Sequence, residues 1–296
     1  MVTTARYLVA GCGYVGARLA RTLLARGPVV ALTRIGGSCE ALEAQGIDAI
    51  AWNLDDPDAP VPRRLGTPSV IFYLVPPPTS GTTDPRIKRF LARLPAAPAR
   101  LLYVSTTSVY GDAGGALVNE DSPLNPGSER ALRRIDAETA VRGWCERQGV
   151  GWTIVRVPGI YGPGRLPIER LKRGEPMIRH SEAGYSIRIH VDDLVAACLL
   201  AATVPRAVDR IYNVTDGNPA SMTEYFERVA TLTGLPPPPL VTREEAQSVL
   251  SPGLLSYLAE SRRVDSSRIR EEIGFAPRFK DLRLGILSSL PAPQDA

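Results

Sequence analysis

Short, nearly continuous apolar runs alternate along the first half of the chain with segments whose apolar residues recur at helical spacing. The apolar runs are β-prone, and strands that are covered on both faces have this character. They lie at residues 7–10, 29–33, 47–52, 70–75, 101–105 and 152–157. The helical segments between them lie at residues 14–26, 39–45, 84–94 and 128–148. This alternation predicts an α/β fold with a doubly wound parallel sheet.

The pattern becomes irregular after residue 157, where Pro and Gly signal loops at 158–159 and 162–164. We expect a strand at 186–190, a helix at 193–203 and a strand at 210–214. The proline run at 236–239 is expected to break one C-terminal helix from the next, because proline cannot continue a helix. Chemistry that depends on this region is therefore harder to place from the sequence.

Three glycines follow the first apolar run with the spacing G-x-G-x-x-G, at Gly11, Gly13 and Gly16. In a strand–turn–helix unit, the first allows a tight turn, the second lets backbone N–H groups approach a pyrophosphate, and the third lets the helix pack closely on the sheet. The phosphates then lie at the helix N-terminus, where N–H groups are free. This context predicts a dinucleotide site, with a plain glycine turn as the alternative.

Charge and composition exclude several other classes of function. The net charge is +4, with 35 Lys and Arg interspersed among 31 Asp and Glu, so no basic face for nucleic acid is predicted. Cys12, Cys39, Cys145 and Cys198 lack C-x-x-C spacing and only two histidines are present, so we expect buried free thiols and no metal site. No apolar stretch approaches membrane-spanning length, so we expect a soluble, cytoplasmic protein that does not bind membranes.

Four further motifs occur in a fixed order after the glycine turn: LLYVSTTSVYGD (101–112), VRVPGIYGPG (155–164), IHVDDLVAA (189–197) and SRRVDSSRIREEIGF (261–275). Together they resemble the extended short-chain dehydrogenase/reductase family, also called the NAD-dependent epimerase/dehydratase family, over nearly the whole chain. The resemblance implies a Rossmann-type fold, a nicotinamide cofactor and a small-molecule substrate, such as a nucleotide sugar or another carbonyl or hydroxyl compound.

One family motif departs from its usual form. The family carries Y-x-x-x-K with a Glu four residues later, and aligning that Glu with Glu138 places Arg130 at the tyrosine and Arg134 at the lysine. The family tyrosine exchanges a proton during hydride transfer. Arginine stays protonated and cannot replace it. This departure, with the G-x-G-x-x-G spacing, resembles the atypical YeeZ-like subgroup, which keeps the nucleotide site and lacks the standard catalytic residues.

The resemblance makes Thr106 the residue that hydrogen-bonds the reacting oxygen, although a hydroxyl at a strand end also satisfies backbone groups. Arg130 and Arg134 share one helix face. They would bind a substrate carboxylate or phosphate, contact the cofactor, stabilise developing charge, or simply be solvated. Other tyrosines considered as replacement acids are Tyr110 and Tyr161, which match packing positions, and Tyr185, which lies in the variable region.

The cofactor is expected to be NADP, with NAD as the alternative. The second strand ends at Thr33-Arg34 with no carboxylate before Glu40, and arginine suits a 2′-phosphate where a carboxylate would bind the 2′-hydroxyl of NAD. Asn53 and Leu54 match the pair that contacts adenine in the family. The full set of expected cofactor contacts is Gly11, Gly13, Tyr14, Val15, Gly16, Thr33, Arg34, Asn53, Leu54, Leu74, Val75, Pro76, Ser105, Pro158 and Ile160.

We expect a Rossmann domain formed by residues 1–164 and 186–215 and a smaller C-terminal substrate lobe formed by 165–185 and 216–290. The motif around His190 predicts that Asp192 caps a helix and that the histidine is not catalytic. Two functions stay open, an NADP(H)-dependent oxidoreductase or epimerase of unorthodox mechanism and a non-catalytic NADP(H)-binding sensor or regulatory module. The sequence does not decide between a monomer and a homodimer.

Overall fold

The structure is a computed structural model that describes residues 6–291. Its centre is a seven-stranded sheet in which every pairing is parallel, in the order β12-β7-β5-β4-β1-β2-β3. These strands are β1 (Tyr7–Ala10), β2 (Val29–Thr33), β3 (Asp48–Ala51), β4 (Val70–Tyr73), β5 (Arg100–Thr106), β7 (Gly151–Val157) and β12 (Arg210–Asn213). The doubly wound α/β prediction is confirmed.

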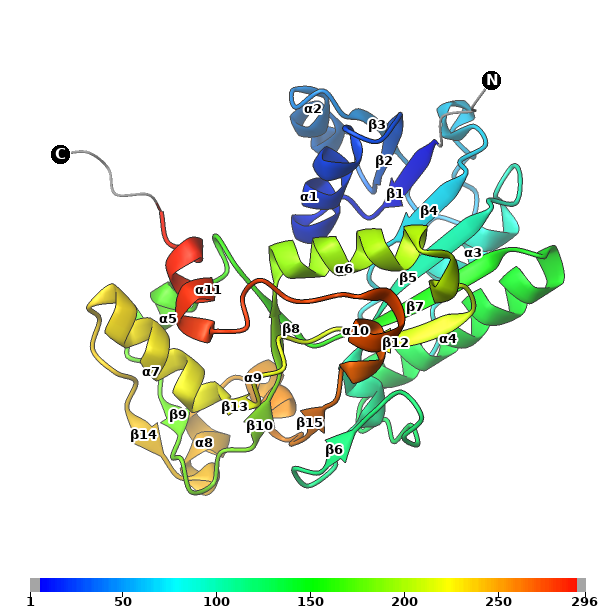
Figure 1. The fold of residues 1–296 in the computed structure, drawn as a ribbon. Helices are drawn as coiled ribbons and strands as arrows, with labels where there is room; N and C mark the ends of the chain where they lie inside the picture. Colours follow the sequence, from blue (N-terminus) through cyan, green and yellow to red (C-terminus); the bar gives the residue numbers. More distant parts are fainter. Residues whose placement is uncertain (1–5, 292–296) are drawn as a thin grey trace.

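Helices cover both faces of this sheet (Figure 1). One face packs against α1 (Tyr14–Leu23), α2 (Gly37–Glu43), α6 (Val191–Thr203) and α10 (Ser267–Ile273), and the other against α3 (Pro85–Ala92) and α4 (Glu129–Gln148). The helix ends follow local chemistry. The Ser128 hydroxyl accepts a hydrogen bond from the Ala131 N–H at the start of α4, and Gly149 ends that helix in the left-handed conformation.

The chain runs outward from β1 to β2 and β3, and then returns to the other side of β1 to form β4 and β5. The order of the strands therefore reverses between β1 and β4. In sheets of this kind, a crevice opens at that point beyond the carboxyl ends of the strands. The glycine turn after β1 lies at this crevice.

The C-terminal segments build a second region, at the lower left of Figure 1, with its own hydrophobic cluster around Leu171, Met177, Phe226 and Ile286. Its elements are α5 (Ile168–Lys172), β9 (Met177–Ile178), α7 (Met222–Thr233), β14 (Leu240–Val241), α8 (Arg243–Val249), α9 (Pro252–Leu258) and α11 (Leu282–Ser289). The remaining short strands are β6 (Leu117–Val118), β8 (Gly159–Tyr161), β10 (Tyr185–Ser186), β11 (Arg188–His190), β13 (Ala220–Ser221) and β15 (Arg263–Val264). Three single turns of 3-10 helix occur at η1 (Arg63–Leu65), η2 (Thr107–Tyr110) and η3 (Pro205–Ala207).

Two local predictions around residue 190 were wrong. The strand expected over 186–190 is divided, because β10 pairs with β13 while β11 pairs with β8. The helix that follows begins at Val191 and is capped by His190, whose Nδ1 accepts a hydrogen bond from the Asp192 N–H at 3.2 Å. Asp192 instead lies in the first turn, where a carboxylate suits the helix dipole.

Smaller differences concern the proline run and the cysteines. Residues 236–239 separate α7 from the strand β14 and not from another helix. All four cysteines are free, but only Cys145 and Cys198 are fully buried, while Cys12 and Cys39 are partly buried. Burial raises the pKa of the Cys12 thiol to about 12, so this thiol stays protonated at neutral pH although it lies at the glycine turn.

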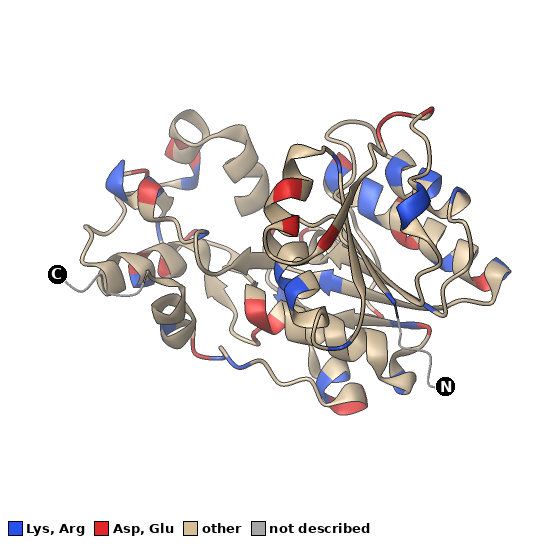
Figure 2. Cartoon of the chain, turned by 90° about the horizontal axis from the view of Figure 1, so that it is seen from above, with Lys and Arg blue, Asp and Glu red and all other residues tan. Residues whose placement is uncertain are grey.

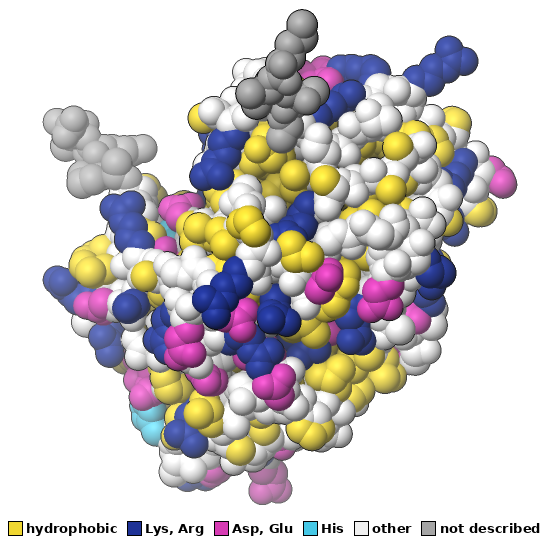
Figure 3. All heavy atoms as spheres, turned by 45° about the vertical axis from the view of Figure 1, so that its right-hand side comes forward, with side chains coloured by type: hydrophobic (Ala, Val, Ile, Leu, Met, Phe, Trp, Pro, Cys, Tyr) yellow, Lys and Arg dark blue, Asp and Glu magenta, His cyan; other side chains and the backbone are white. Residues whose placement is uncertain are grey.

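Charged groups of both signs are spread over the molecule. In Figure 2 the basic and acidic segments alternate along the helices, and in Figure 3 basic and acidic side chains lie close together across the middle of the visible face. Among residues 6–291, none of the helices is long and apolar enough to span a membrane.

Candidate active site

A cavity of about 640 Å³ lies at the carboxyl edge of the sheet, and we call it the sheet-edge cavity. Its walls come from the ends of β1, β2, β4, β5 and β7, which is where the reversal of strand order predicts a ligand. Its lining residues are Gly11, Cys12, Gly13, Tyr14, Val15, Gly16, Leu32, Thr33, Arg34, Ser38, Trp52, Leu54, Asp55, Leu74, Val75, Pro76, Arg86, Val104, Ser105, Thr106, Arg134, Val157, Pro158, Ile160 and Arg165.

The three glycines are used in three different ways. Gly11 has a φ of +93°, and a Cβ there would lie 2.7 Å from the Val75 backbone nitrogen. A Cβ on Gly16 would collide with the Gly11 carbonyl oxygen, whereas a Cβ on Gly13 would meet no atom within 4 Å. No side chain caps the N-terminus of α1 at Gly13. The open space and the uncapped helix end fit the phosphates of a dinucleotide.

Of the cofactor contacts expected from the sequence, all but one line the sheet-edge cavity. The exception is Asn53, whose side-chain oxygen accepts a hydrogen bond from the Asp55 N–H at 3.1 Å and holds a turn. The lining residues that sequence reasoning missed include Ser38, Asp55, Arg86 and Arg165. They lie on loops and helices that only the folded chain brings to this edge, so no spacing in the sequence marks them.

The lining of the sheet-edge cavity is basic, with four arginines and a single carboxylate, Asp55. Arg86 donates two hydrogen bonds to Asp55, from Nε at 2.6 Å and Nη2 at 2.8 Å. These hydrogen bonds lower the pKa of Asp55, which therefore stays ionised and paired. Arg34, directly after β2, also helps to lower the pKa of Asp55 but forms no ion pair with it.

Thr106 is the last residue of β5 and lines the sheet-edge cavity. The sequence predicts that the nicotinamide lies at this end of the cavity. Its hydroxyl accepts a hydrogen bond from the Ser108 N–H at 3.2 Å and lies 3.0 Å from the Ser108 hydroxyl. The threonine therefore caps η2 while its side chain still borders the cavity. The sequence left two roles open for Thr106, bonding to backbone groups and facing a substrate. The fold allows both.

A buried polar network lies directly behind Thr106. The Ser105 hydroxyl donates to Glu138 at 2.6 Å, and Arg156 forms an ion pair with Glu138 at 2.8 Å. Arg156 also donates to the Tyr110 hydroxyl at 3.0 Å, and that hydroxyl donates to Asn213 at 2.8 Å. Tyr110 is thus committed to this network, and burial raises its pKa. The network fixes the end of β5 against α4 and β7.

Arg134 and Arg130 lie one turn apart on α4 and border different cavities. Arg134 donates from Nη1 to the Tyr103 hydroxyl at 3.1 Å and to the Val104 carbonyl at 3.0 Å, and it lines the sheet-edge cavity. Arg130 is exposed and lines a smaller cavity of about 140 Å³, which we call the corner cavity. The other residues that line the corner cavity are Thr106, Thr107, Ser108, Pro158, Gly159, Tyr185, Ser186, Ile187, Tyr257, Glu260 and Arg262.

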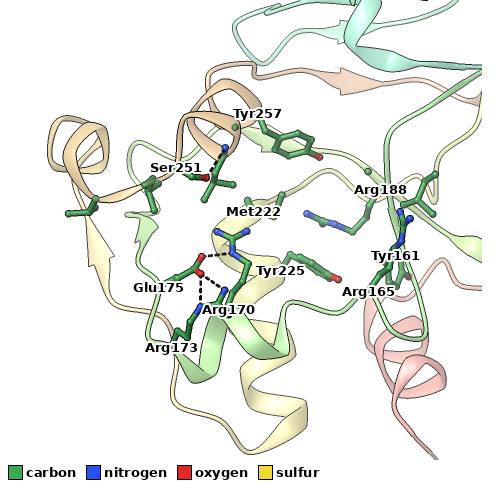
Figure 4. Close-up of a pocket in the computed structure, with 16 residues that line it drawn as sticks. Tyr161, Arg165, Arg170, Arg173, Glu175, Arg188, Met222, Tyr225, Ser251 and Tyr257 are labelled. Carbon is green, nitrogen blue, oxygen red and sulfur yellow. Dashed lines mark hydrogen bonds and ion pairs between the residues drawn. The ribbon is translucent and has the colours of Figure 1, made fainter. Parts of the chain in front are cut away.

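A third cavity of about 770 Å³, the lobe cavity, lies between β8, β11 and the C-terminal region. The charged and aromatic residues of its lining are Tyr161, Arg165, Arg170, Arg173, Glu175, Arg188, Tyr225 and Tyr257 (Figure 4). Arg170 and Arg173 both pair with Glu175, at 2.5 Å each. These pairs leave Arg165 and Arg188 as the arginines of the lining without a carboxylate partner within salt-bridge distance among the described residues.

Arg188 is 3% exposed, and its guanidinium extends between Tyr225 and Tyr257 in Figure 4. Its Nη2 donates to the Ser221 carbonyl at 3.3 Å, and the guanidinium lies 4.6 Å from the centre of the Tyr225 ring. Its Nη1 and the Tyr225 hydroxyl have no hydrogen-bond partner among the described residues. An unpaired donor on a buried cation is costly, so this pair of groups favours an anionic ligand.

The three cavities meet along β8 and the proline before it. Pro158 lines both the sheet-edge and the corner cavities, Gly159 lines the corner and the lobe cavities, and Ile160 lines the lobe and the sheet-edge cavities. Tyr257 borders the lobe and corner cavities, and its hydroxyl lies 3.2 Å from the Ser186 hydroxyl. Residues 158–160 therefore separate three neighbouring cavities, and Thr106 lines two of them, the sheet-edge and the corner cavities.

Both histidines have structural environments. His190 is buried between Tyr161 and Phe279, and burial lowers its pKa, so it is neutral at pH 7. His180 is exposed and lies 3.0 Å from Glu227. Within residues 6–291, no three His, Cys, Asp or Glu side chains are grouped to hold a metal ion.

Comparison with known proteins places these features in a family context. Residues 87–215 match the family described as the NAD dependent epimerase/dehydratase family. The chain is 29% identical to protein YeeZ of Escherichia coli K12, over 92% of this chain and 96% of that protein.

Solved structures show the same fold over nearly the whole chain. A functionally unknown conserved protein from Silicibacter pomeroyi is 28% identical, with a TM-score of 0.78 and coverage of 96% of this chain and 97% of that one. MoeE5, solved in complex with UDP-glucose and NAD, is 23% identical, with a TM-score of 0.75 and the same coverage of both chains. At that identity, the likeness to MoeE5 supports the fold alone.

Proposed function

Since the chain belongs to the NAD-dependent epimerase/dehydratase family, we propose that it is an NADP(H)-dependent oxidoreductase or epimerase that acts on a nucleotide sugar. The observation that supports this proposal is that the sheet-edge and lobe cavities are neighbours, with Ile160 and Arg165 lining both. One cavity fits a dinucleotide and the other has a buried, unpaired guanidinium suited to a phosphate. Thr106 lines the first of these cavities and also the corner cavity, which adjoins the second.

We assign the cofactor to residues 1–164 and 186–215 and most of the distal substrate contacts to residues 165–185 and 216–290, with residues 159–161 and Arg188 of the first part completing the lobe cavity. The first part contributes the whole sheet-edge lining except Arg165. In the second part, α10 packs with the sheet core through Ile269 and Ile273, so this segment joins the two regions without lining the lobe cavity. The cleft between the regions is where a substrate meets the cofactor.

The preference for NADP rests on charge at the end of β2. Arg34 and Ser38 line the cavity there, and the only carboxylate in the lining, Asp55, is held by Arg86. A guanidinium and a hydroxyl suit a ribose 2′-phosphate, whereas NAD is usually held by an acidic residue at this position. A nicotinamide cofactor supplies or accepts hydride when it is bound.

The chain's own groups position the substrate. Thr106 places a hydroxyl at the junction of the cavities, where it can donate a hydrogen bond to a substrate oxygen. Arg134, fixed by Tyr103 and the Val104 carbonyl, holds positive charge at the same end and stabilises negative charge on that oxygen. In our alignment, α4 carries Arg130 and Arg134 in place of the family's Tyr and Lys, so it supplies no proton donor.

The nucleotide-sugar assignment rests on the lobe cavity. Arg188 and Arg165 offer two guanidiniums free to bind phosphate, and the cavity volume of about 770 Å³ is suitable for a ligand of nucleotide size. MoeE5, with the same fold, binds UDP-glucose, which makes UDP-glucose a reasonable first probe.

A non-catalytic NADP(H) sensor is the second candidate, and a specific observation favours it. The position assigned to the family tyrosine is occupied by Arg130, which is exposed and cannot transfer a proton at neutral pH. A sensor needs the sheet-edge cavity but no proton donor beside Thr106.

The two candidates are separated by titrating the purified chain with NADPH and NADH, followed by nicotinamide fluorescence, with and without UDP-glucose. We expect NADPH to bind more tightly than NADH and UDP-glucose to bind to the NADP⁺-loaded protein. Turnover of UDP-glucose or a related nucleotide sugar, with Thr106→Ala strongly reducing it, would establish the enzyme. Tight NADPH binding without turnover on any nucleotide sugar would favour the sensor, and absence of nucleotide binding would contradict both.

A further inference from the structure

The corner cavity is not needed to hold a nucleotide, yet it adjoins both of the other cavities. It shares Thr106 and Pro158 with the sheet-edge cavity, and Gly159 and Tyr257 with the lobe cavity. Its volume of about 140 Å³ is too small for a nucleotide but sufficient for a small substituent. A group carried near the reacting carbon of a substrate would therefore enter it.

The lining of the corner cavity carries an excess positive charge. Arg130 and Arg262 contribute two guanidiniums, and Glu260 contributes the only carboxylate. Glu260 is already paired with Arg262 at 2.6 Å, and the Arg262 Nη1 also donates to the Gly111 carbonyl at 2.6 Å. Arg130 makes no hydrogen bond or ion pair with any residue that the structure describes. Its charge is available to a ligand.

Hydroxyl donors surround the same space. Thr106 and Ser108 lie on one wall, 3.0 Å apart at their oxygens, and Ser186 and Tyr257 lie on another, 3.2 Å apart. A cation surrounded by hydroxyl donors suits a small anion that accepts several hydrogen bonds. A carboxylate fits this description, because its two oxygens match the planar fork of an arginine.

We infer that the corner cavity binds a carboxylate which the substrate carries close to its reacting carbon, and that Arg130 determines this specificity. The substrate is then an acidic nucleotide sugar with its phosphates in the lobe cavity and its carboxylate beside Arg130. This inference rests on the proposed nucleotide-sugar function. It gives a role to the arginine that occupies the position assigned to the family's tyrosine.

The test compares UDP-glucuronate with UDP-glucose, which differ by a carboxylate in place of a hydroxymethyl group on the sugar. Binding of each to the full chain saturated with NADP⁺ is measured by calorimetry, so that turnover is not required. We expect UDP-glucuronate to bind about tenfold more tightly, as one charge-assisted hydrogen-bonded pair would give. Arg130→Gln should remove this preference and leave the affinity for UDP-glucose unchanged.

Two further variants sharpen the result. Arg130→Lys keeps the charge without the planar fork and should keep part of the preference. Arg147→Gln removes an exposed arginine at the far end of α4, which lines none of the three cavities, and should change neither affinity. Because Arg130 is exposed, its substitution should not disturb folding, and circular dichroism checks this.

The inference is overturned if the wild-type chain shows no preference for UDP-glucuronate, or if Arg130→Gln weakens both ligands equally. Binding of UDP-glucose alone would leave the proposed function standing and contradict the carboxylate site. Binding of neither ligand, with NADPH still bound, would contradict the nucleotide-sugar proposal and this inference with it.

Discussion

The sheet-edge cavity lies at the ends of five parallel strands beside the glycine turn, whereas the lobe cavity is lined by residues drawn from several short elements between residues 159 and 257. In the first, the critical feature is a missing atom, the Cβ that Gly13 lacks beside the open end of α1. In the second, it is a hydrogen-bond donor without an acceptor among the described residues, Nη1 of Arg188. We therefore expect the sheet-edge cavity to be sensitive to added atoms at the glycine turn, and the lobe cavity to be sensitive to loss of the charge on Arg188.

The largest effect is expected from the glycines. Gly16→Ala places a methyl group against the Gly11 carbonyl oxygen, and we expect it to destabilise the fold by about 2–3 kcal/mol, measured as a lower urea midpoint. Gly13→Ala places the methyl group in open space, so its stability should change by less than about 1 kcal/mol. Its affinity for NADPH should nevertheless fall at least tenfold. Equal stability of the two variants would contradict this distinction.

A large effect on one ligand only is expected from Arg188→Met. If Arg188 binds a substrate phosphate as we propose, removing this buried guanidinium should weaken UDP-glucose binding by about 30-fold or more. The affinity for NADPH should remain that of the wild type, because Arg188 does not line the sheet-edge cavity. Calorimetry with both ligands measures the two constants. A parallel loss of NADPH affinity would show that the two cavities do not act separately.

A smaller effect is expected from Arg34→Ala at the end of β2. Loss of the guanidinium should weaken NADPH binding by about tenfold and leave NADH binding nearly unchanged, because only NADPH carries the 2′-phosphate. Fluorescence titration with both cofactors gives the ratio. As a control, Arg26→Ala removes an exposed arginine outside the cavity lining. Equal weakening of both cofactors would contradict the assignment of NADP.

The smallest effect concerns Asp216, which is 4% exposed and lies beside β11. Burial raises its pKa from 3.8 to about 7, opposed by Arg188 and assisted by Asp193. The folded chain thus binds the proton of the Asp216 carboxyl more tightly than the unfolded chain does. The contribution of Asp216 to the free energy of unfolding therefore decreases as the pH rises from about 4 to about 7.

Asp216→Asn removes that dependence. The Tm of the variant relative to wild type should rise by a few degrees between pH 5 and pH 8, measured by differential scanning calorimetry. The substituted amide oxygen can still accept the hydrogen bond that the Asn218 N–H donates at 2.9 Å. A constant difference across this pH range would show that Asp216 is ionised throughout.

Periodicity and local chemistry in the sequence were sufficient for the α/β fold and the glycine turn. Six of the seven strands of the sheet lie on short apolar runs, and β12 lies on the strand expected over 210–214. Each predicted helix around the sheet begins and ends within a few residues of its predicted limits. Fourteen of the fifteen expected cofactor contacts line one cavity because they follow directly from strand ends, and parallel strands all end at the same edge. Asn53 is the exception, since its side chain is taken up by a local turn.

The lobe and corner cavities were decided by the tertiary structure alone. Arg188 became a candidate ligand group only when folding buried it beside Tyr225 without a partner for Nη1, and Tyr257 reached Gly159 from a helix nearly a hundred residues later in the chain. The division of Arg130 and Arg134 between two cavities also required the fold. The glycine turn and the strand ends consist of residues that are neighbours in the sequence, so a sequence pattern reveals them. The side chains of the lobe and corner cavities are brought together by long-range packing, which a sequence pattern does not reveal.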